Sequence, residues 1–264
     1  MILEQSEHII HEVKKVFIGK DDTIRRVLTT IYAGGHILLE DCPGVGKTTL
    51  ALAFSRALGL DYRRIQFTTD TLPSDITGFT MYNTQTGKFE YRSGATNCNL
   101  LLADEINRTS PKTQSALLEA MEERSVTVDG VTHRLPNPFI CIATQNPIGT
   151  SGTQALPESQ MDRFMVRLSI GYPSDEDQLK ILRTRKYTNP LDNIQVVSGA
   201  ENIVDIQNYL STMTMSDEVL YYLIHLCEAT RQDAMVDLGV SPRGVLALTQ
   251  MARAHAMLEE RSYV

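Results

Sequence analysis

A glycine-rich turn that ends in a lysine offers the first chemistry in this sequence. The turn follows the apolar run 37–39 and reads Cys42-Pro43-Gly44-Val45-Gly46-Lys47-Thr48-Thr49. Glycines let backbone N–H groups close around an anion, a lysine meets the outer phosphates, and a threonine hydroxyl can ligate Mg²⁺. Residues 43–49 therefore indicate a phosphate-binding loop, in which Lys47 holds phosphates and Thr48 is a metal ligand.

The match to a phosphate loop has one departure. The pattern G-x-x-x-x-G-K-[ST] asks for glycine where this chain has Asp41. Taken alone, the segment is also compatible with a glycine-rich turn that carries a surface lysine. A helical pattern follows the turn, however, with Leu50, Ala53 and Phe54 among its apolar residues. Because phosphates bind at helix N-termini, this pattern favours the phosphate loop, and we expect Asp41 to leave nucleotide binding intact.

Two carboxylates supply the second half of the chemistry. The apolar run 100–103 reads as a buried strand, and Asp104 and Glu105 follow it. One carboxylate suits the ligand shell of Mg²⁺, and the other can polarise an attacking water. On their own they are also compatible with two solvated acids at a strand end. In this order after the lysine-bearing turn, they predict a nucleoside triphosphatase in which Thr48 and Asp104 hold Mg²⁺ and Glu105 activates water.

The composition limits the classes of protein to which the chain can belong. Its 264 residues include 25 basic and 32 acidic side chains, for a net charge of −7, which argues against nucleic acid as a partner. Four cysteines without C-x-x-C spacing predict reduced thiols, and six histidines show no metal-ligand spacing. The N-terminus does not read as a signal peptide, and no apolar run approaches the roughly 20 residues that span a bilayer. We therefore expect a cytoplasmic protein without a membrane span.

Short apolar runs and helical patterns alternate through the first part of the chain. Five runs read as buried strands, and the helical patterns between them predict an α/β fold with a parallel sheet covered on both faces. Amphipathic helices are expected over 3–17 and after Asp21, and a capped helix begins at Ser110-Pro111. Two inserted hairpins are expected, the second around Asp129-Gly130. The expected strands cover 37–40, 62–67, 99–103, 139–144 and 164–169, and the hairpins 79–91 and 126–133.

The pattern changes after Gly171-Tyr172-Pro173, beyond which every regular pattern is helical. We expect a nucleotide-binding core over 1–172 and a helical lid over 173–264. The lid ends soon after its last helix, which indicates either a truncated chain or a short natural end. The expected helices cover 175–186, 201–211, 217–231 and 242–260.

These features together resemble the MoxR family of AAA+ ATPases. The resemblance spans almost the whole chain and implies a P-loop NTPase fold with a five-stranded parallel sheet and an all-helical lid. The two hairpins resemble the helix-2 insert and pre-sensor-1 hairpin of the AAA+ branch that holds magnesium chelatase and the MCM helicases. The motifs that carry the resemblance are Asp104-Glu105-Ile106-Asn107-Arg108, Leu118-Glu119-Ala120-Met121-Glu122-Glu123-Arg124, Ala143-Thr144-Gln145-Asn146-Pro147, and Leu156-Pro157-Glu158 through Asp162-Arg163-Phe164.

Asn146 and Arg163 gain roles from the resemblance. Asn146 ends a strand predicted to lie between the phosphate-loop strand and the strand that carries Asp104; the resemblance implies sensor 1, and the alternative is an Asx turn before a proline. Arg163 is implied as an arginine finger that reaches the ATP of a neighbouring subunit, and the alternative is a structural salt bridge. Arg124 and Arg108 are further candidates for that finger.

Arg243 and the pair Ile18-Gly19 complete the expected site. Arg243 falls in the first turn of a helix, where the dipole disfavours a cation unless an anion lies nearby. ATP phosphate is the anion that the resemblance implies, with Arg243 as sensor 2, and the alternative is a solvated arginine. The resemblance alone places Ile18 and Gly19 near adenine.

The resemblance also implies the biological activity. It implies a homo-oligomeric ring, expected to be a hexamer, that binds ATP or ADP with Mg²⁺ and remodels a client protein, often one with a von Willebrand factor A domain. One alternative is a nucleic-acid motor of the MCM kind, against which the acidic charge argues. The other is a nucleotide-gated switch with little turnover, which would not need a base such as Glu105.

Overall fold

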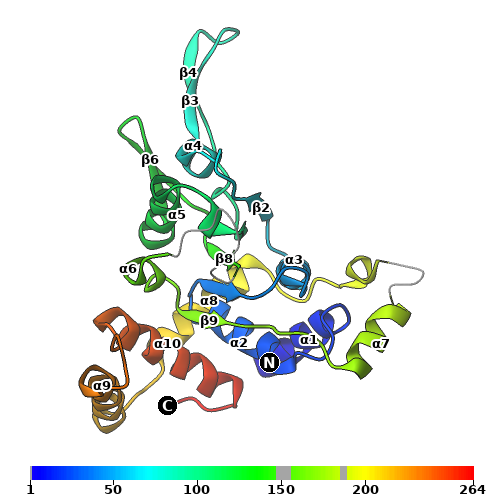
Figure 1. The fold of residues 1–264 in the computed structure, drawn as a ribbon, viewed down its shortest axis with the longest axis vertical. Coiled ribbons are helices and arrows are strands. Elements are labelled where there is room, and N and C mark those ends of the chain that lie inside the picture. The colour runs from blue at the N-terminus through cyan, green and yellow to red at the C-terminus, as the bar shows by residue number, and fades with distance from the viewer. Residues whose placement is uncertain (1, 147–155, 185–188) are drawn as a thin grey trace.

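Five parallel strands form the central sheet of the molecule. The structure is a computed structural model that describes residues 2–146, 156–184 and 189–264. Figure 1 shows the sheet at the centre of the fold, with the chain's two ends below it. Its strand order is β2-β5-β8-β1-β9, with the bounds Tyr62–Gln66, Leu100–Asp104, Ile140–Gln145, Ile37–Glu40 and Val166–Leu168.

The strand order brings the predicted catalytic segments to one edge. β8 lies between β1, which leads into the phosphate loop, and β5, which carries Asp104, so the predicted position of Asn146 in the sheet is confirmed. All pairs in this sheet are parallel, and the carboxyl ends of the strands therefore meet on the same side. Ligands of open α/β sheets bind beyond that edge.

Apolar side chains at alternate positions along the strands cover the two faces of the sheet. Along β5, Leu100 and Leu102 belong to one buried cluster, and Leu101 and Ala103 belong to the other. The first cluster packs under α1 (Ile2–Lys14), α2 (Asp21–Tyr32) and α3 (Lys47–Ala57), and the second packs under α5 (Pro111–Glu123). The fold is thus the predicted three-layer α/β arrangement.

The C-terminal part is helical, as predicted, and forms a lid. The helices α8 and α10 pack against α1 and α2 in the first apolar cluster, so that cluster continues from the sheet into the lid. The predicted boundary near residue 172 stays a prediction. A 3₁₀ turn at Pro190–Asn193 and a bridge between Thr214 and Tyr263 are additions to the predicted pattern. The lid helices are α7 (Asp175–Thr184), α8 (Ala200–Thr212), α9 (Asp217–Gln232) and α10 (Pro242–Leu258).

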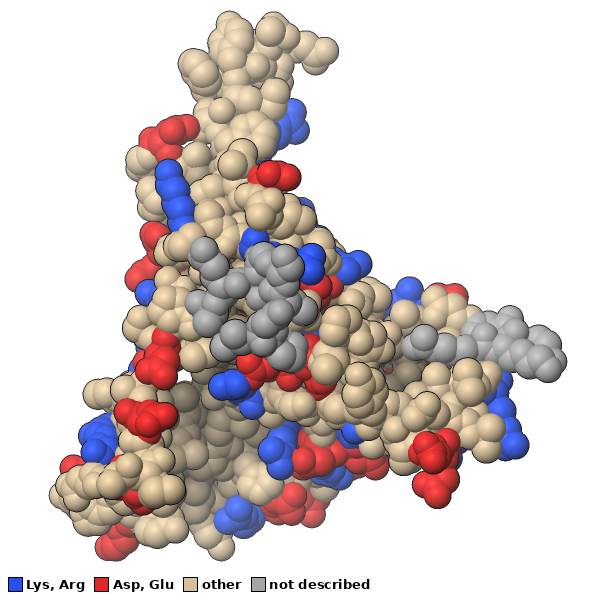
Figure 2. All heavy atoms as spheres, in the orientation of Figure 1, with Lys and Arg blue, Asp and Glu red and all other residues tan. Residues whose placement is uncertain are grey.

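Both predicted hairpins are present. The β3–β4 hairpin (Phe79–Asn83 and Lys88–Arg92) projects from the top of Figure 1, and β6–β7 (Ser125–Val128 and Val131–Arg134) lies beside it. The far end of the β3–β4 hairpin shows no charged side chain in Figure 2, because its turn at 83–87 is uncharged. At the other end, Tyr91 stacks on His133 with ring centroids 3.8 Å apart, which joins the two hairpins.

Several element ends differ from the prediction. α1 ends at Lys14 rather than at residue 17, because Phe17 turns inward to pack against the phosphate loop at Gly46. The last strand is shorter than predicted. Two short helices, α4 (Pro73–Thr77) and α6 (Glu158–Met161), have no counterpart in the prediction. Pro147 and the last two residues of the helix predicted over 175–186 lie outside the described residues.

Candidate active site

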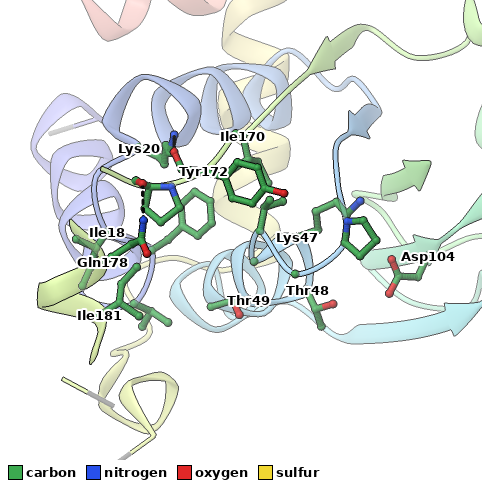
Figure 3. A pocket seen from close by; sticks show the side chains of 18 of the residues that line it. Ile18, Lys20, Lys47, Thr48, Thr49, Asp104, Ile170, Tyr172, Gln178 and Ile181 are labelled. Carbon is green, nitrogen blue, oxygen red and sulfur yellow. Dashed lines mark hydrogen bonds between the residues drawn. The ribbon is translucent and has the colours of Figure 1, made fainter. Parts of the chain in front are cut away.

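A cavity of about 610 Å³ lies at the carboxyl edge of the sheet. Figure 3 shows Lys47, Thr48 and Asp104 toward one side of it and Ile18, Gln178 and Ile181 toward the other. The lining side chains are therefore polar and charged at one end and mostly apolar at the other. A purine nucleoside triphosphate likewise has a charged end, the phosphates, and a mostly apolar end, the base.

The phosphate loop forms the polar end. It connects β1 to α3, with Gly44 at φ 87° and Gly46 at φ 99°, a region that side chains other than glycine rarely adopt. A side chain at Gly46 would also crowd Phe17, whose ring lies 3.2 Å from the position of the absent Cβ. The first N–H groups of α3 have no acceptor within the helix, so they are free to bind an anion.

Asp41, the departure from the loop pattern, has a structural role. Its carboxylate accepts hydrogen bonds from the backbone N–H groups of Cys42 (2.8 Å), Ile170 (2.7 Å) and Gly171 (2.6 Å), and from the Ser169 hydroxyl (3.0 Å). Burial alone would raise the pKa of this carboxyl, but the four donors outweigh burial and lower the pKa. Asp41 thus joins the start of the loop to the segment that leads into the lid.

Lys47 lies on the floor of the cavity. Its buried Nζ donates to the backbone oxygen of Asp41 at 2.7 Å and to Oδ1 of Asn146 at 3.4 Å. Burial lowers the pKa of Lys47, and the charges of Asp104, Asp41 and Glu105 oppose that shift. The ammonium group is therefore held in place beside the phosphate loop.

Asp104 is fixed by contacts from both neighbouring strands. Its Oδ1 accepts from the Thr144 hydroxyl at 2.7 Å, and its Oδ2 accepts from Arg64 Nη2 at 2.7 Å and Nε at 3.2 Å. The Thr144 hydroxyl also accepts the backbone N–H of Glu105 at 2.9 Å. One threonine on β8 therefore sets the position of both acidic residues.

Glu105 combines an unusual backbone with a well-held carboxylate. Its φ of 58° and ψ of 48° are left-handed, a conformation that persists in a non-glycine residue only when its surroundings impose it. Oε1 accepts from Asn146 Nδ2 at 2.9 Å, and Oε2 accepts from Gln66 Nε2 at 2.9 Å and pairs with Arg108 Nε at 3.1 Å. Asn146 therefore bridges Lys47 and Glu105, the two groups assigned to phosphate and to water.

The residues that would hold Mg²⁺ fit that ion. Thr48 and Asp104 line the same cavity and offer a hydroxyl and a carboxylate, the hard oxygen ligands that Mg²⁺ prefers. In the described part of the chain, no three His, Cys, Asp or Glu side chains gather closely enough to form a metal cage. A Mg²⁺ ion would therefore depend on phosphate oxygens and water for the rest of its ligands, as is usual for this ion in nucleotide sites.

The apolar end of the cavity includes one of the two residues predicted near adenine. Ile18 lines it, together with Val16, Phe17, Ile170 and Leu182. Gly19 does not line it; its φ is 80°, and a Cβ there would lie 2.0 Å from Oδ2 of Asp177 in α7. Gly19 therefore serves the close approach of α7 to the rest of the site.

The structure does not bring Arg163 or Arg243 into this cavity. Both arginines line a second hollow of about 280 Å³, between α5, the segment after α6, and the start of α10. There they meet the same carboxylate, Glu122: Arg243 Nη2 donates to Oε1 at 2.8 Å, and Arg163 Nε lies 3.7 Å from Oε2. They are neighbours of each other, away from the chain's own phosphate loop.

The two further finger candidates have other partners. Arg124 donates to the backbone oxygens of Phe139 and Gly34, so its guanidinium fastens the start of β8 to the segment before β1. Arg108 pairs with Glu105 beside the chain's own site. Arg124 is therefore committed to the core and Arg108 to the chain's own acid pair, and the finger role of Arg163 stays a prediction.

Sequence reasoning missed three polar residues that contact the acid pair: Arg64, Gln66 and Thr144. Arg64 and Gln66 alternate along β2 and point toward the acid pair, and Thr144 is buried in β8. The available signal was polar residues at the carboxyl ends of strands predicted to flank the acid pair. For Arg64 and Gln66 this signal was not usable without knowing that β2 lies beside β5.

Known proteins resemble this chain over most of its length. The model of the ATPase family associated with various cellular activities (AAA) matches residues 36–166, and that of the AAA lid domain matches 228–264. The uncharacterized protein YeaC of Bacillus subtilis is 48% identical over 97% of this chain and 80% of its own length. Chaperone MoxR1 of Mycobacterium tuberculosis is 38% identical over 98% of this chain and 70% of its own length. A crystal structure from Cytophaga hutchinsonii superposes with a TM-score of 0.90 at 38% identity, over 99% of this chain and 82% of the other.

Proposed function

This chain belongs to the MoxR family of AAA+ ATPases, and from that premise we propose that it hydrolyses ATP to ADP and phosphate in a Mg²⁺-dependent reaction. One observation carries the proposal: Asn146 joins Lys47 to Glu105 within a cavity that also contains Thr48 and Asp104. Phosphate binding, metal binding and water activation thus have residues of the right chemistry within one site. A binding module without turnover would not need the last of these.

The residues of this site divide the reaction among them. The loop amides and Lys47 bind the β- and γ-phosphates. Thr48 and Asp104 would hold Mg²⁺, which would neutralise charge on the phosphates. Glu105 accepts a proton from the attacking water, and the contacts from Asn146 and Gln66 orient its carboxylate. Asp41 keeps the loop in position through the segment 169–171.

We propose that hydrolysis requires a neighbouring copy of the chain. Arg163 and Arg243 lie together outside the chain's own cavity, which supports a role for both on the nucleotide of an adjacent subunit. An arrangement in which each subunit completes the site of the next closes most simply as a ring, and we propose a hexamer. Turnover per subunit should then rise with protein concentration.

We further propose that the ring remodels a client protein in the cytoplasm. The exposed aromatic side chains of Phe79, Tyr82 and Phe89 on the protruding β3–β4 hairpin support contact with another protein. All four cysteines are free thiols, which supports a reducing compartment. In the described part of the chain, no helix is both long and apolar enough to cross a bilayer. A client with a von Willebrand factor A domain is the expectation from the family resemblance.

Steady-state phosphate release tests the proposal. Wild-type protein with ATP and Mg²⁺ should release phosphate, and Glu105→Gln, which keeps the shape of the side chain but removes the base, should bind ATP without releasing it. Omitting Mg²⁺ should stop release by the wild type. If the wild type binds ATP but releases no phosphate at any protein concentration, the chain is a nucleotide-gated switch instead.

A further inference from the structure

Two arginines from separate parts of the chain share one carboxylate. Glu122 lies in the last turn of α5, Arg163 follows α6, and Arg243 is in the first turn of α10. α5, α6 and α10 follow one another down the left side of Figure 1. Glu122 thus uses one oxygen for an arginine of the core and the other for an arginine of the lid.

The contact to Arg163 orients the side chain without locking it. Nε of Arg163 is buried and has no hydrogen-bond acceptor in the described part of the chain, and 3.7 Å from Glu122 is an ion-pair distance only. Buried N–H donors nearly always have a hydrogen-bond acceptor in native structures. The arginine is therefore held near Glu122 by charge and not by a hydrogen bond.

The contact to Arg243 belongs to a larger junction between core and lid. Asp162, the residue before Arg163, accepts from the Ser241 hydroxyl at 2.8 and 2.9 Å, and Ser241 caps α10 through the N–H of Gly244. Two core carboxylates therefore face the positive end of the α10 dipole. Glu122 also offsets the unfavourable position of the Arg243 cation in the first helical turn.

We propose that Glu122 is a positioning residue that holds Arg163 and Arg243 as a pair, so that both reach the triphosphate of a neighbouring subunit together. The inference rests on the proposed function, because it assumes hydrolysis completed by a second copy. A displaced finger arginine costs rate rather than affinity, since its contact matters most in the transition state. Glu122 should therefore affect kcat and leave ATP binding in the chain's own cavity unchanged.

Substitutions at Glu122 give the first readout. Glu122→Gln and Glu122→Ala should lower kcat on the order of 10²-fold, the usual cost of misplacing a catalytic group. The KM for ATP should stay near the wild-type value. The midpoint of thermal unfolding should fall, because the offset to the Arg243 cation is lost, but both variants should be folded at the assay temperature. Glu119→Gln, an exposed change one turn earlier on α5, is the matched control and should hydrolyse ATP at the wild-type rate.

Subunit mixing separates positioning in trans from a structural effect on the same subunit. Glu122→Ala subunits keep an intact cavity, and Glu105→Gln subunits keep intact arginines, so each supplies what the other lacks. The mixture should therefore release phosphate faster than the sum of the two proteins assayed alone. No gain on mixing, or a wild-type rate in Glu122→Ala, would overturn the inference while leaving the proposed function in place. A wild type without turnover would overturn both.

Discussion

The carboxylate of Asp41 accepts the backbone N–H of Gly171 at 2.6 Å, and so joins two segments 130 residues apart in the chain. One segment begins the phosphate loop, and the other leads from the last strand into the lid. Because the same carboxylate also binds Cys42, Ile170 and Ser169, the loop cannot shift without disturbing the lid connection. The residue that departs from the usual loop pattern is thus a structural link between nucleotide site and lid.

Restoring the usual glycine should destabilise the protein. Asp41→Gly leaves the buried N–H of Ile170 and the half-buried N–H of Gly171 without an acceptor, and a buried orphan costs about 1–3 kcal/mol. Urea denaturation should show a lower free energy of unfolding than in the wild type, whereas the exposed change Asp70→Asn should have no effect. A variant Asp41→Gly as stable as the wild type would show that these hydrogen bonds contribute nothing.

The contribution of Asp41 should depend on pH. Its pKa is lowered in the folded state, so the folded chain binds this proton less tightly than the unfolded chain does. The stabilisation is complete above the unfolded value, about 3.9, and is lost as the pH falls through the folded value. The difference in unfolding free energy between wild type and Asp41→Asn should therefore shrink below about pH 4. A difference that stays constant from pH 7 to pH 3 would contradict the assignment.

Asn146 should matter for turnover more than for binding. Asn146→Ala removes the amide that bridges Lys47 and Glu105, and losing one positioned amide typically lowers kcat by about 10²–10³-fold. The Kd for ATP should change little, because the loop amides and Lys47 remain. Single-turnover hydrolysis and equilibrium ATP binding, measured on the same preparation, would separate these effects; an equal loss in both would assign Asn146 to binding.

Arg163 and Arg124 should differ in what they control. Arg163→Ala should lower turnover by ~10³-fold or more with ATP binding intact, as for other fingers in phosphoryl transfer. Arg124→Ala leaves the carbonyl groups of Phe139 and Gly34 without their donor and should lower stability instead. Phosphate release and thermal unfolding, measured on both variants, would check these two expectations. Normal turnover in Arg163→Ala would show that Arg163 is not the arginine finger.

The fold was largely predictable because its central strands β1, β5 and β8 are buried runs with clear limits. The strand over 62–67 was also predicted to be buried, and that was wrong: β2 is half-buried to exposed, because it lies at the edge of the sheet. The run 100–104 is a fully buried strand, as predicted. Ser110 caps its helix as predicted, and Ser216 and Ser241 cap theirs in the same way. Short helices such as α4 were not predictable, since a single turn has no periodicity to detect.

Site residues that belong to one local motif were predictable from the sequence. Site contacts between segments far apart in the chain were not. Lys47 and Thr48 follow from the loop, and Asp104 and Glu105 from the strand end. The partnership of Asp41 with Gly171 depends on which strand flanks β1, and that of Glu122 with Arg243 depends on how α10 docks. No local pattern encodes such neighbours.

Calorimetric titration of the full chain with ATP and Mg²⁺ tests the central claim most directly, namely that the lysine-bearing loop and the acid pair bind one nucleotide. We predict one site per chain in the wild type, weaker binding when Mg²⁺ is chelated, and no measurable heat of binding for Lys47→Ala. Absence of binding by the wild type, or equal affinity in Lys47→Ala, would contradict the account.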